Sequence, residues 1–133
     1  MHVPAFVLGV ALIAGASAPA SQKDATPEAR LAQALEGRVA GKPVNCIAQS
    51  RITRTRIFER TAILYEVGGT FFVNHPRVGA QSLRRDDVLM TRRTTGGQLC
   101  RLDTVDLITR ASRVRRGSVG LDHFVPYTRP RTQ

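Results

Sequence analysis

The chain has only two cysteines, few aromatic residues and no internal repeat or low-complexity tract, and these shortages exclude several classes of protein. The cysteines do not form a CxxC motif, which argues against a redox-active dithiol. Both Gly-Gly pairs lie in expected hairpin turns and not before helices, so no phosphate-binding loop is predicted. With 133 residues, the chain is too short for a two-domain enzyme. We therefore expect one small domain.

Charged residues are absent from the first 22 positions. An apolar run from Val3 to Ala16 is followed by small residues, and Ala18-Pro19-Ala20 fits a cleavage site before Ser21. Residues 1–20 are therefore predicted to be a secretory signal peptide, which places the protein in the periplasm or outside the cell. The alternative is an uncleaved N-terminal anchor, since about 20 uncharged residues can span a bilayer. No other stretch approaches that length, so the mature chain should have no transmembrane span.

Export changes the interpretation of the two cysteines. An even number of cysteines in an exported chain predicts a disulfide, here between Cys46 and Cys100. Closing a loop of this length stabilises a domain by about 4 kcal/mol in the chain-entropy model. A zinc site would need His75 and His123 as further ligands, and the spacing of these four residues matches no known zinc pattern. We expect a structural disulfide, no metal and no cofactor.

The N-terminal part of the mature chain predicts one helix. Residues 21–26 are small and polar, and we expect a disordered start there. Thr26 provides a hydroxyl cap, Pro27 occupies the first turn, and Gly37 suits a C-terminal cap. These signals predict a short amphipathic helix over residues 27–36, packed against the domain.

The clearest strand signal is a hairpin. Residues 61–67 and 70–74 are rich in β-branched and aromatic residues and are separated by Gly68-Gly69, which favours a primed turn. This register pairs Tyr65 with Phe72 and Leu64 with Val73. Because the two pairs lie on opposite faces, both faces are apolar. Such a hairpin belongs in the middle of a sandwich or barrel, or at a subunit interface.

The remaining chain predicts further short strands. We expect a second hairpin between residues 88–91 and 98–102, an extended segment rather than a helix over 105–109, and a loop over 114–118. A last strand should run from residue 119 to 125 and end before Pro126, and the basic tail 128–133 should fray. The predicted fold is mainly β: one domain over 27–127, a small sandwich or partly open barrel of about six short strands with one N-terminal helix.

The order of these motifs is similar to that of short exported proteins of unassigned function from Gram-negative bacteria. The resemblance covers residues 27–127 and is carried by a helix followed by four segments. These are Gly-Lys-Pro-Val-Asn-Cys-Ile (41–47), Ala-Ile-Leu-Tyr-Glu-Val-Gly-Gly-Thr (62–70), Gln-Leu-Cys-Arg-Leu-Asp (98–103) and Phe-Val-Pro-Tyr (124–127), each in this order along the chain. It implies no particular activity, because that group of exported proteins has no assigned chemistry.

Catalytic signals are sparse. A nucleophile needs a base that a third group orients, and His123 is the candidate base. Asp122 is its neighbour, but successive residues of a strand point to opposite faces, so Asp122 is not expected to orient His123. Asp86-Asp87 follows Arg84-Arg85, which favours a local ion-pair cluster over acid–base chemistry. A small periplasmic hydrolase using His123 is the alternative to a non-enzymatic binding domain.

Basic residues outnumber acidic ones by 20 to 10, and 18 of the 20 are arginine. Arginine matches phosphate and carboxylate geometry, so an anionic lipid, lipopolysaccharide or a cell-wall polymer is the expected partner class. Nucleic acid is disfavoured because the aromatics fall on expected core strands instead of alternating with arginines. The candidate anion site is Arg113, Arg115 and Arg116, in an expected loop with no nearby acid in sequence. The alternative is a basic surface that serves only solubility.

Overall fold

The structure is a computed structural model that describes residues 9, 15, 25–92 and 95–131. Apart from Gly9 and Gly15, the predicted signal peptide lies outside the described residues, as do residues 21–24 and 132–133. In the part of the chain that is described, no helix is long and apolar enough to cross a membrane.

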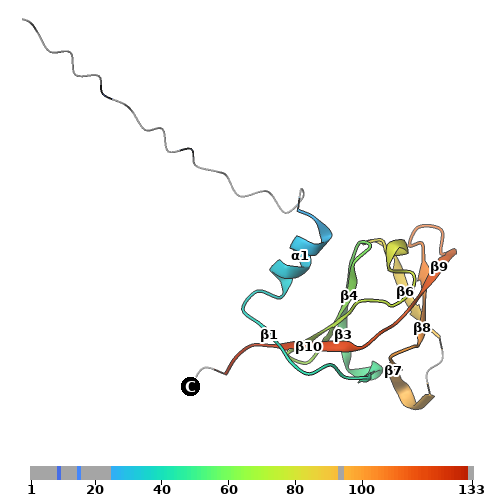
Figure 1. The fold of residues 1–133 in the computed structure, drawn as a ribbon. Coiled ribbons are helices and arrows are strands. Elements are labelled where there is room, and N and C mark those ends of the chain that lie inside the picture. Colours follow the sequence, from blue (N-terminus) through green and yellow to red (C-terminus); the bar gives the residue numbers. More distant parts are fainter. Residues whose placement is uncertain (1–8, 10–14, 16–24, 93–94, 132–133) are drawn as a thin grey trace, which may run out of the picture.

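The described chain is mainly β, as predicted, with one α-helix, α1 (Pro27–Ala34), and three antiparallel sheets, none of which closes into a barrel (Figure 1). The five-stranded sheet has the order β1 (Val39–Ala40), β10 (Phe124–Thr128), β5 (Thr70–Asn74), β4 (Ala62–Val67) and β3 (Ile52–Phe58). A two-stranded sheet pairs β2 (Cys46–Ala48) with β7 (Gln98–Cys100). The third has the order β6 (Val88–Thr91), β8 (Thr104–Ile108) and β9 (Arg115–Gly120).

Helix α1 forms where the capping signals predicted it. The hydroxyl Oγ1 of Thr26 accepts a hydrogen bond of 3.1 Å from the backbone N–H of Ala29, and Pro27 begins the first turn. The helix ends at Ala34, two residues earlier than predicted. The backbone then reverses at Gly37, whose φ of 76° lies in the left-handed region that glycine adopts without strain.

The central hairpin has the predicted register. β4 pairs with β5 so that Tyr65 faces Phe72 and Leu64 faces Val73, and Gly68 at the turn has a φ of 60°. Tyr65 belongs to a core on one face of the sheet, whereas Leu64 belongs to a core on the other face. The hairpin therefore lies in the middle layer of the molecule, with apolar contacts on both sides.

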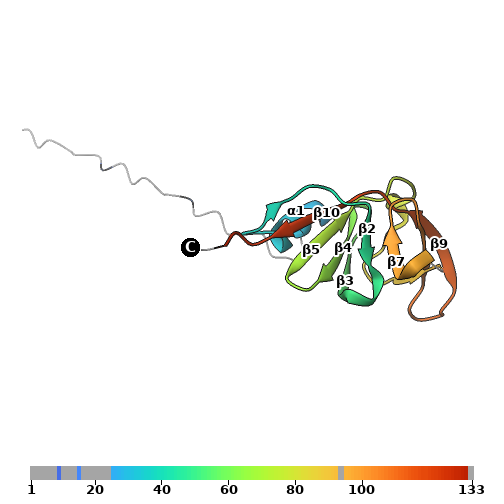
Figure 2. The same cartoon turned by 90° about the horizontal axis from the view of Figure 1, so that it is seen from below.

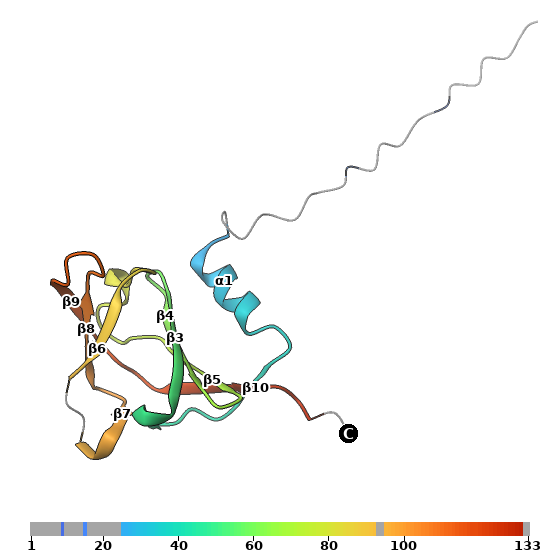
Figure 3. The same ribbon diagram turned by 180° about the vertical axis from the view of Figure 1, so that it is seen from behind.

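Different elements cover the two faces of the five-stranded sheet. Helix α1 lies on one side and the β6–β8–β9 sheet on the other, as Figures 1 and 3 both show. The helix-side core contains Leu31, Phe58, Ala62, Leu64 and Val73. The opposite core is larger and includes Ile63, Leu99, Leu107, Leu121 and Phe124. The arrangement is a small β-sandwich with a helix covering its outer face.

The predicted disulfide joins Cys46 to Cys100. These residues lie directly opposite each other in the pair β2–β7, which is seen from below in Figure 2. The predicted second hairpin is therefore wrong: β7 pairs with β2, and β6 pairs with β8. The crosslink and the buried neighbours Ile47 and Leu99 hold β7 on a strand 54 residues away in sequence, a partner that local periodicity cannot identify.

The C-terminal strands differ from the prediction in two places. The extended segment over 105–109 is confirmed as β8, but the expected loop at 114–118 is wrong because β9 begins at Arg115 and pairs with β8. The last strand, β10, does not stop before Pro126 and continues to Thr128. Proline is tolerated at position 126 because the adjacent backbone at Gly41 bonds to the carbonyl of Pro126 and needs no N–H from it. That carbonyl accepts a hydrogen bond of 2.7 Å from the N–H of Gly41.

Candidate functional site

A groove of about 1060 Å³ runs along the free edge of β3. β3 lies between α1 and β6 in Figures 1 and 3, and both neighbours contribute walls. The lining residues are Arg30, Gln33 and Ala34 of α1, residues 55–58 of β3, Arg85, residues 87–89 and Arg110.

Helix and strand periodicity place these residues in the groove. Arg30, Gln33 and Ala34 are separated by three and four positions, so they share one face of α1 beside the buried Leu31. On β3, Arg56 lies on the same face as Phe58, and its guanidinium carbon is 5.2 Å from the centre of the Phe58 ring. The groove therefore has an apolar floor with charged side chains above it.

The charge of the groove is almost entirely positive. Its four arginines, Arg30, Arg56, Arg85 and Arg110, make no ion pair with a carboxylate of the described residues. The single acid in the lining, Asp87, is buried and bonds to Arg116 instead. The Nε of Arg30 is buried and has no hydrogen-bond partner among the residues described. An anionic group in the groove would offset the charges of these arginines.

The sequence-predicted anion cluster has a different environment. Arg115 Nε lies 3.1 Å from Asp106 Oδ1, and Arg116 bonds to Asp87 and, at 2.6 Å, to the carbonyl of Ser82. The premise that no acid neutralises these arginines is therefore wrong for two of the three. Arg113 is exposed in the β8–β9 turn. The expected ion-pair cluster around Asp86-Asp87 is also wrong for Asp87, because its partner comes from β9.

Asp106 is the centre of a second ion-pair group. It is 8% exposed, and Arg92 Nε lies 3.3 Å from its Oδ2 while Arg115 approaches its Oδ1. Burial raises the pKa of Asp106, but the hydrogen bonds and charges of Arg115 and Arg92 outweigh that effect and leave the pKa below its ordinary value. These two arginines are occupied in neutralising a buried carboxylate.

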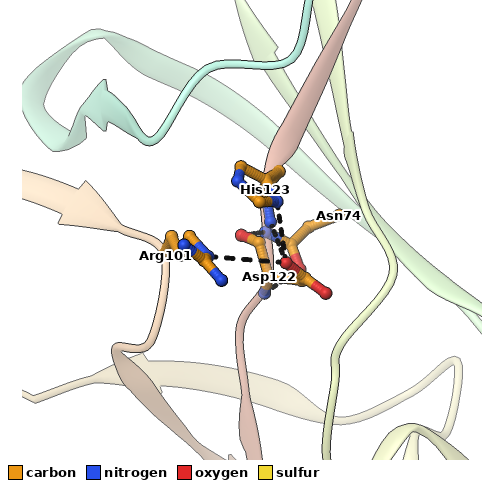
Figure 4. A network of polar contacts seen from close by, with 4 residues as sticks. All are labelled: Asn74, Arg101, Asp122 and His123. Atoms are coloured by element: carbon orange, nitrogen blue, oxygen red, sulfur yellow. Dashed lines mark hydrogen bonds and ion pairs between the residues drawn. The ribbon is translucent and has the colours of Figure 1, made fainter.

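The region around His123 forms a polar network on the surface (Figure 4). The Nδ1 of His123 lies 2.9 Å from Asp122 Oδ1, so the expectation that Asp122 cannot orient His123 is wrong. Residues 121–123 lie between β9 and β10, where strand alternation does not apply. Asn74, fully buried, donates to the carbonyl of Asp122 at 2.8 Å and accepts from its N–H at 3.0 Å, which fixes this segment.

Electrostatics favour the ionised form of Asp122. The backbone N–H of His123 donates a hydrogen bond of 2.8 Å to Oδ1 of Asp122. This hydrogen bond lowers the pKa of the Asp122 carboxyl group, and the electrostatic effects of His123 and Arg101 lower it further. A histidine oriented by a carboxylate supplies two of the three members of a catalytic triad, and the third is a nucleophile. Within the described residues, no hydroxyl or thiol bonds to the His123 ring, and His75 contacts the Thr61 carbonyl at 3.3 Å instead. Among the residues described, the network therefore contains no nucleophile hydrogen-bonded to His123.

Metal binding has no support in the part of the chain that the structure covers, because no three His, Cys, Asp or Glu residues gather there. Asp103 instead caps a turn, since its Oδ2 accepts a hydrogen bond of 2.7 Å from the N–H of Cys100.

The groove arginines were not identified from the sequence. They come from α1, β3, the segment before β6 and the turn after β8, and are spread over 80 positions of the chain. Arg30 lies in the segment predicted as a packing helix, and no role as an anion site is assigned to Arg56, Arg85 or Arg110 from the sequence. No spacing signal joins them, because the groove exists only once β3 becomes an edge strand between α1 and β6.

Comparison with known proteins adds no relative: no protein-family model matches the chain, and searches of curated proteins and of solved structures found no significant match.

Proposed function

We propose that this protein is an exported, non-enzymatic binding domain that holds an anionic component of the cell envelope in the groove beside β3. The observation that carries the proposal is the contrast in charge: four groove arginines make no ion pair with a described carboxylate, and the one lining acid bonds elsewhere. Arginine forks bind phosphate and carboxylate groups through paired hydrogen bonds, so a ligand with several negative charges fits this lining.

The export part of the proposal has separate support. The disulfide between Cys46 and Cys100 is typical of an oxidising compartment. The signal-peptide pattern of residues 1–20 and the resemblance to exported proteins of Gram-negative bacteria agree with it. Expression in a Gram-negative host should yield an envelope-fraction protein that begins at Ser21, measured by intact mass. A retained Met1 in the membrane pellet would mean an N-terminal anchor instead.

The binding part is tested with a charge-matched pair of variants. The groove variant carries Arg30→Gln, Arg56→Gln, Arg85→Gln and Arg110→Gln. The control removes the same charge from four exposed arginines outside the groove, at positions 51, 77, 129 and 131. Three probes are used: phosphatidylglycerol vesicles, lipopolysaccharide and poly-L-glutamate.

At least one probe should bind the wild-type protein, and binding should weaken steeply with salt because screening shortens the Debye length from about 10 Å at 0.1 M to about 3 Å at 1 M. The groove variant should bind that probe at least about tenfold more weakly than the control, with an unchanged melting temperature. Equal binding by the two variants would mean that the basic surface contains no localised site.

A further inference from the structure

We infer that the groove ligand is an extended acidic peptide segment that adds to β3 as a further strand of the five-stranded sheet. This inference rests on the proposed function and goes beyond it by naming the class of ligand. Three features carry it: β3 has a free edge, arginines lie on both sides of that edge, and the other candidate occupants lack a matching feature.

The first feature is the backbone of β3. Among the described strands β3 pairs only with β4, so alternate N–H and C=O groups along its other edge point away from the sheet. Residues 53–56 are exposed, and residues 55–58 line the groove. A peptide in extended conformation supplies N–H and C=O groups at the matching spacing, which is the basis of strand addition.

The second feature is the position of the charges. Arg30 and Arg56 lie on the α1 side of β3, because Arg56 shares the face of Phe58 in the helix-side core. Arg85 lies on the opposite side, next to β6. Side chains of an added strand alternate between these two sides, so carboxylates of one short segment reach arginines on either side. A segment of about four to six residues spans the groove at about 3.4 Å per residue.

The third feature is the exclusion of other occupants. A second copy of this chain would bring another net charge of +10, and Arg54 and Arg56 on the exposed edge repel it. A lipid headgroup or a polysaccharide phosphate satisfies the arginines but offers no ladder of amides to β3. An acidic peptide satisfies both the charge and the free backbone groups.

The test compares two peptides of identical charge, Ac-Glu-Glu-Val-Val-Glu-Glu-NH2, whose carboxylates lie on both faces of an extended strand, and the same sequence with every backbone amide nitrogen methylated. Methylation removes the donors that pair with β3 and leaves the carboxylates. We expect the unmethylated peptide to bind at least about tenfold more tightly. Amides of residues 53–57 that face the groove should exchange with deuterium more slowly when it is bound, as measured by NMR.

Each outcome separates this inference from the proposed function. If the two peptides bind equally and both lose affinity in the four-arginine groove variant, the groove binds anions without strand pairing and the inference is wrong while the function stands. Binding of vesicles or lipopolysaccharide but not of the unmethylated peptide, with the same dependence on the groove arginines, leads to the same conclusion. If no polyanion distinguishes the groove variant from the control variant, the proposed function itself fails.

Discussion

The molecule has two arginine-rich regions that differ in what their side chains contact. In the groove, Arg30, Arg56, Arg85 and Arg110 make no ion pair with a described carboxylate. In the second region, which we call the paired cluster, Arg92 and Arg115 bond to Asp106 and Arg116 bonds to Asp87.

The difference follows from where the carboxylates are buried. Asp87 and Asp106 are each 8% exposed, and an unpaired carboxylate at such a position is costly. The arginines of the paired cluster therefore neutralise buried carboxylates, whereas the groove arginines have no such partner among the described residues. Clusters of arginine in a sequence thus do not distinguish structural arginines from those available to a ligand, and four predictions test the distinction.

The largest expected effect concerns Arg116. Replacing Arg116 by Gln leaves the buried carboxylate of Asp87 without its charged partner, and we expect a loss of about 3 kcal/mol in the free energy of unfolding. The matched groove variant Arg85→Gln should change it by less than about 0.5 kcal/mol, because Arg85 is exposed. Urea denaturation of both variants measures the contrast. Equal losses would show that the two regions do not differ in their structural role.

The second prediction places an acid in the groove. Gln33→Glu adds a carboxylate beside the unpaired arginines, and we expect a loss of about fivefold in affinity for poly-L-glutamate, equivalent to about 1 kcal/mol. Gln81→Glu makes the same change in net charge on an exposed turn outside the groove. If both variants weaken binding to the same extent, only the net charge of the protein matters.

The third prediction concerns the pKa of Asp106. In the wild-type protein Arg92 and Arg115 lower the pKa of Asp106. The ionised Asp106 therefore stabilises the folded state at pH values above the pKa of an unfolded aspartate. This stability is lost as the pH falls through the pKa of Asp106 in the folded protein. Replacing Arg92 and Arg115 together by Gln leaves only the effect of burial, which raises the pKa above its ordinary value. The carboxyl carbon shift of Asp106, followed by NMR from pH 2 to 7, should show this reversal. A pKa that stays low in the double variant would mean that the arginines are not its cause.

The smallest effect is expected at the sequence-predicted site. Replacing Arg113 and Arg115 by Gln should change poly-L-glutamate affinity by less than about twofold, because Arg115 is already paired and Arg113 lies outside the groove lining. Titration of this double variant beside Gln33→Glu gives the comparison. A loss of affinity as large as that caused by Gln33→Glu would show that the anion site lies at the β8–β9 turn.

Several elements could be predicted from sequence because their signals are local. The cap at Thr26, the Gly68-Gly69 turn and the alternation of Tyr65 with Leu64 each depend on residues a few positions apart. The disulfide followed from the number of cysteines and the export signal. The partner of β7, the strand at Arg115 and the contact between Asp122 and His123 depend on the surrounding fold, and the sequence-based expectations for them were wrong.

The sequence by itself determined a mainly β protein with one capped helix, a central hairpin with two apolar faces and one covalent crosslink. Only the tertiary structure decided that β3 lies at an edge, that α1 and β6 flank it, and that the arginines divide into paired and unpaired sets. The physical reason is that turns, caps and alternation are set by neighbouring residues, whereas ion pairing and strand order depend on which distant segments packing brings together.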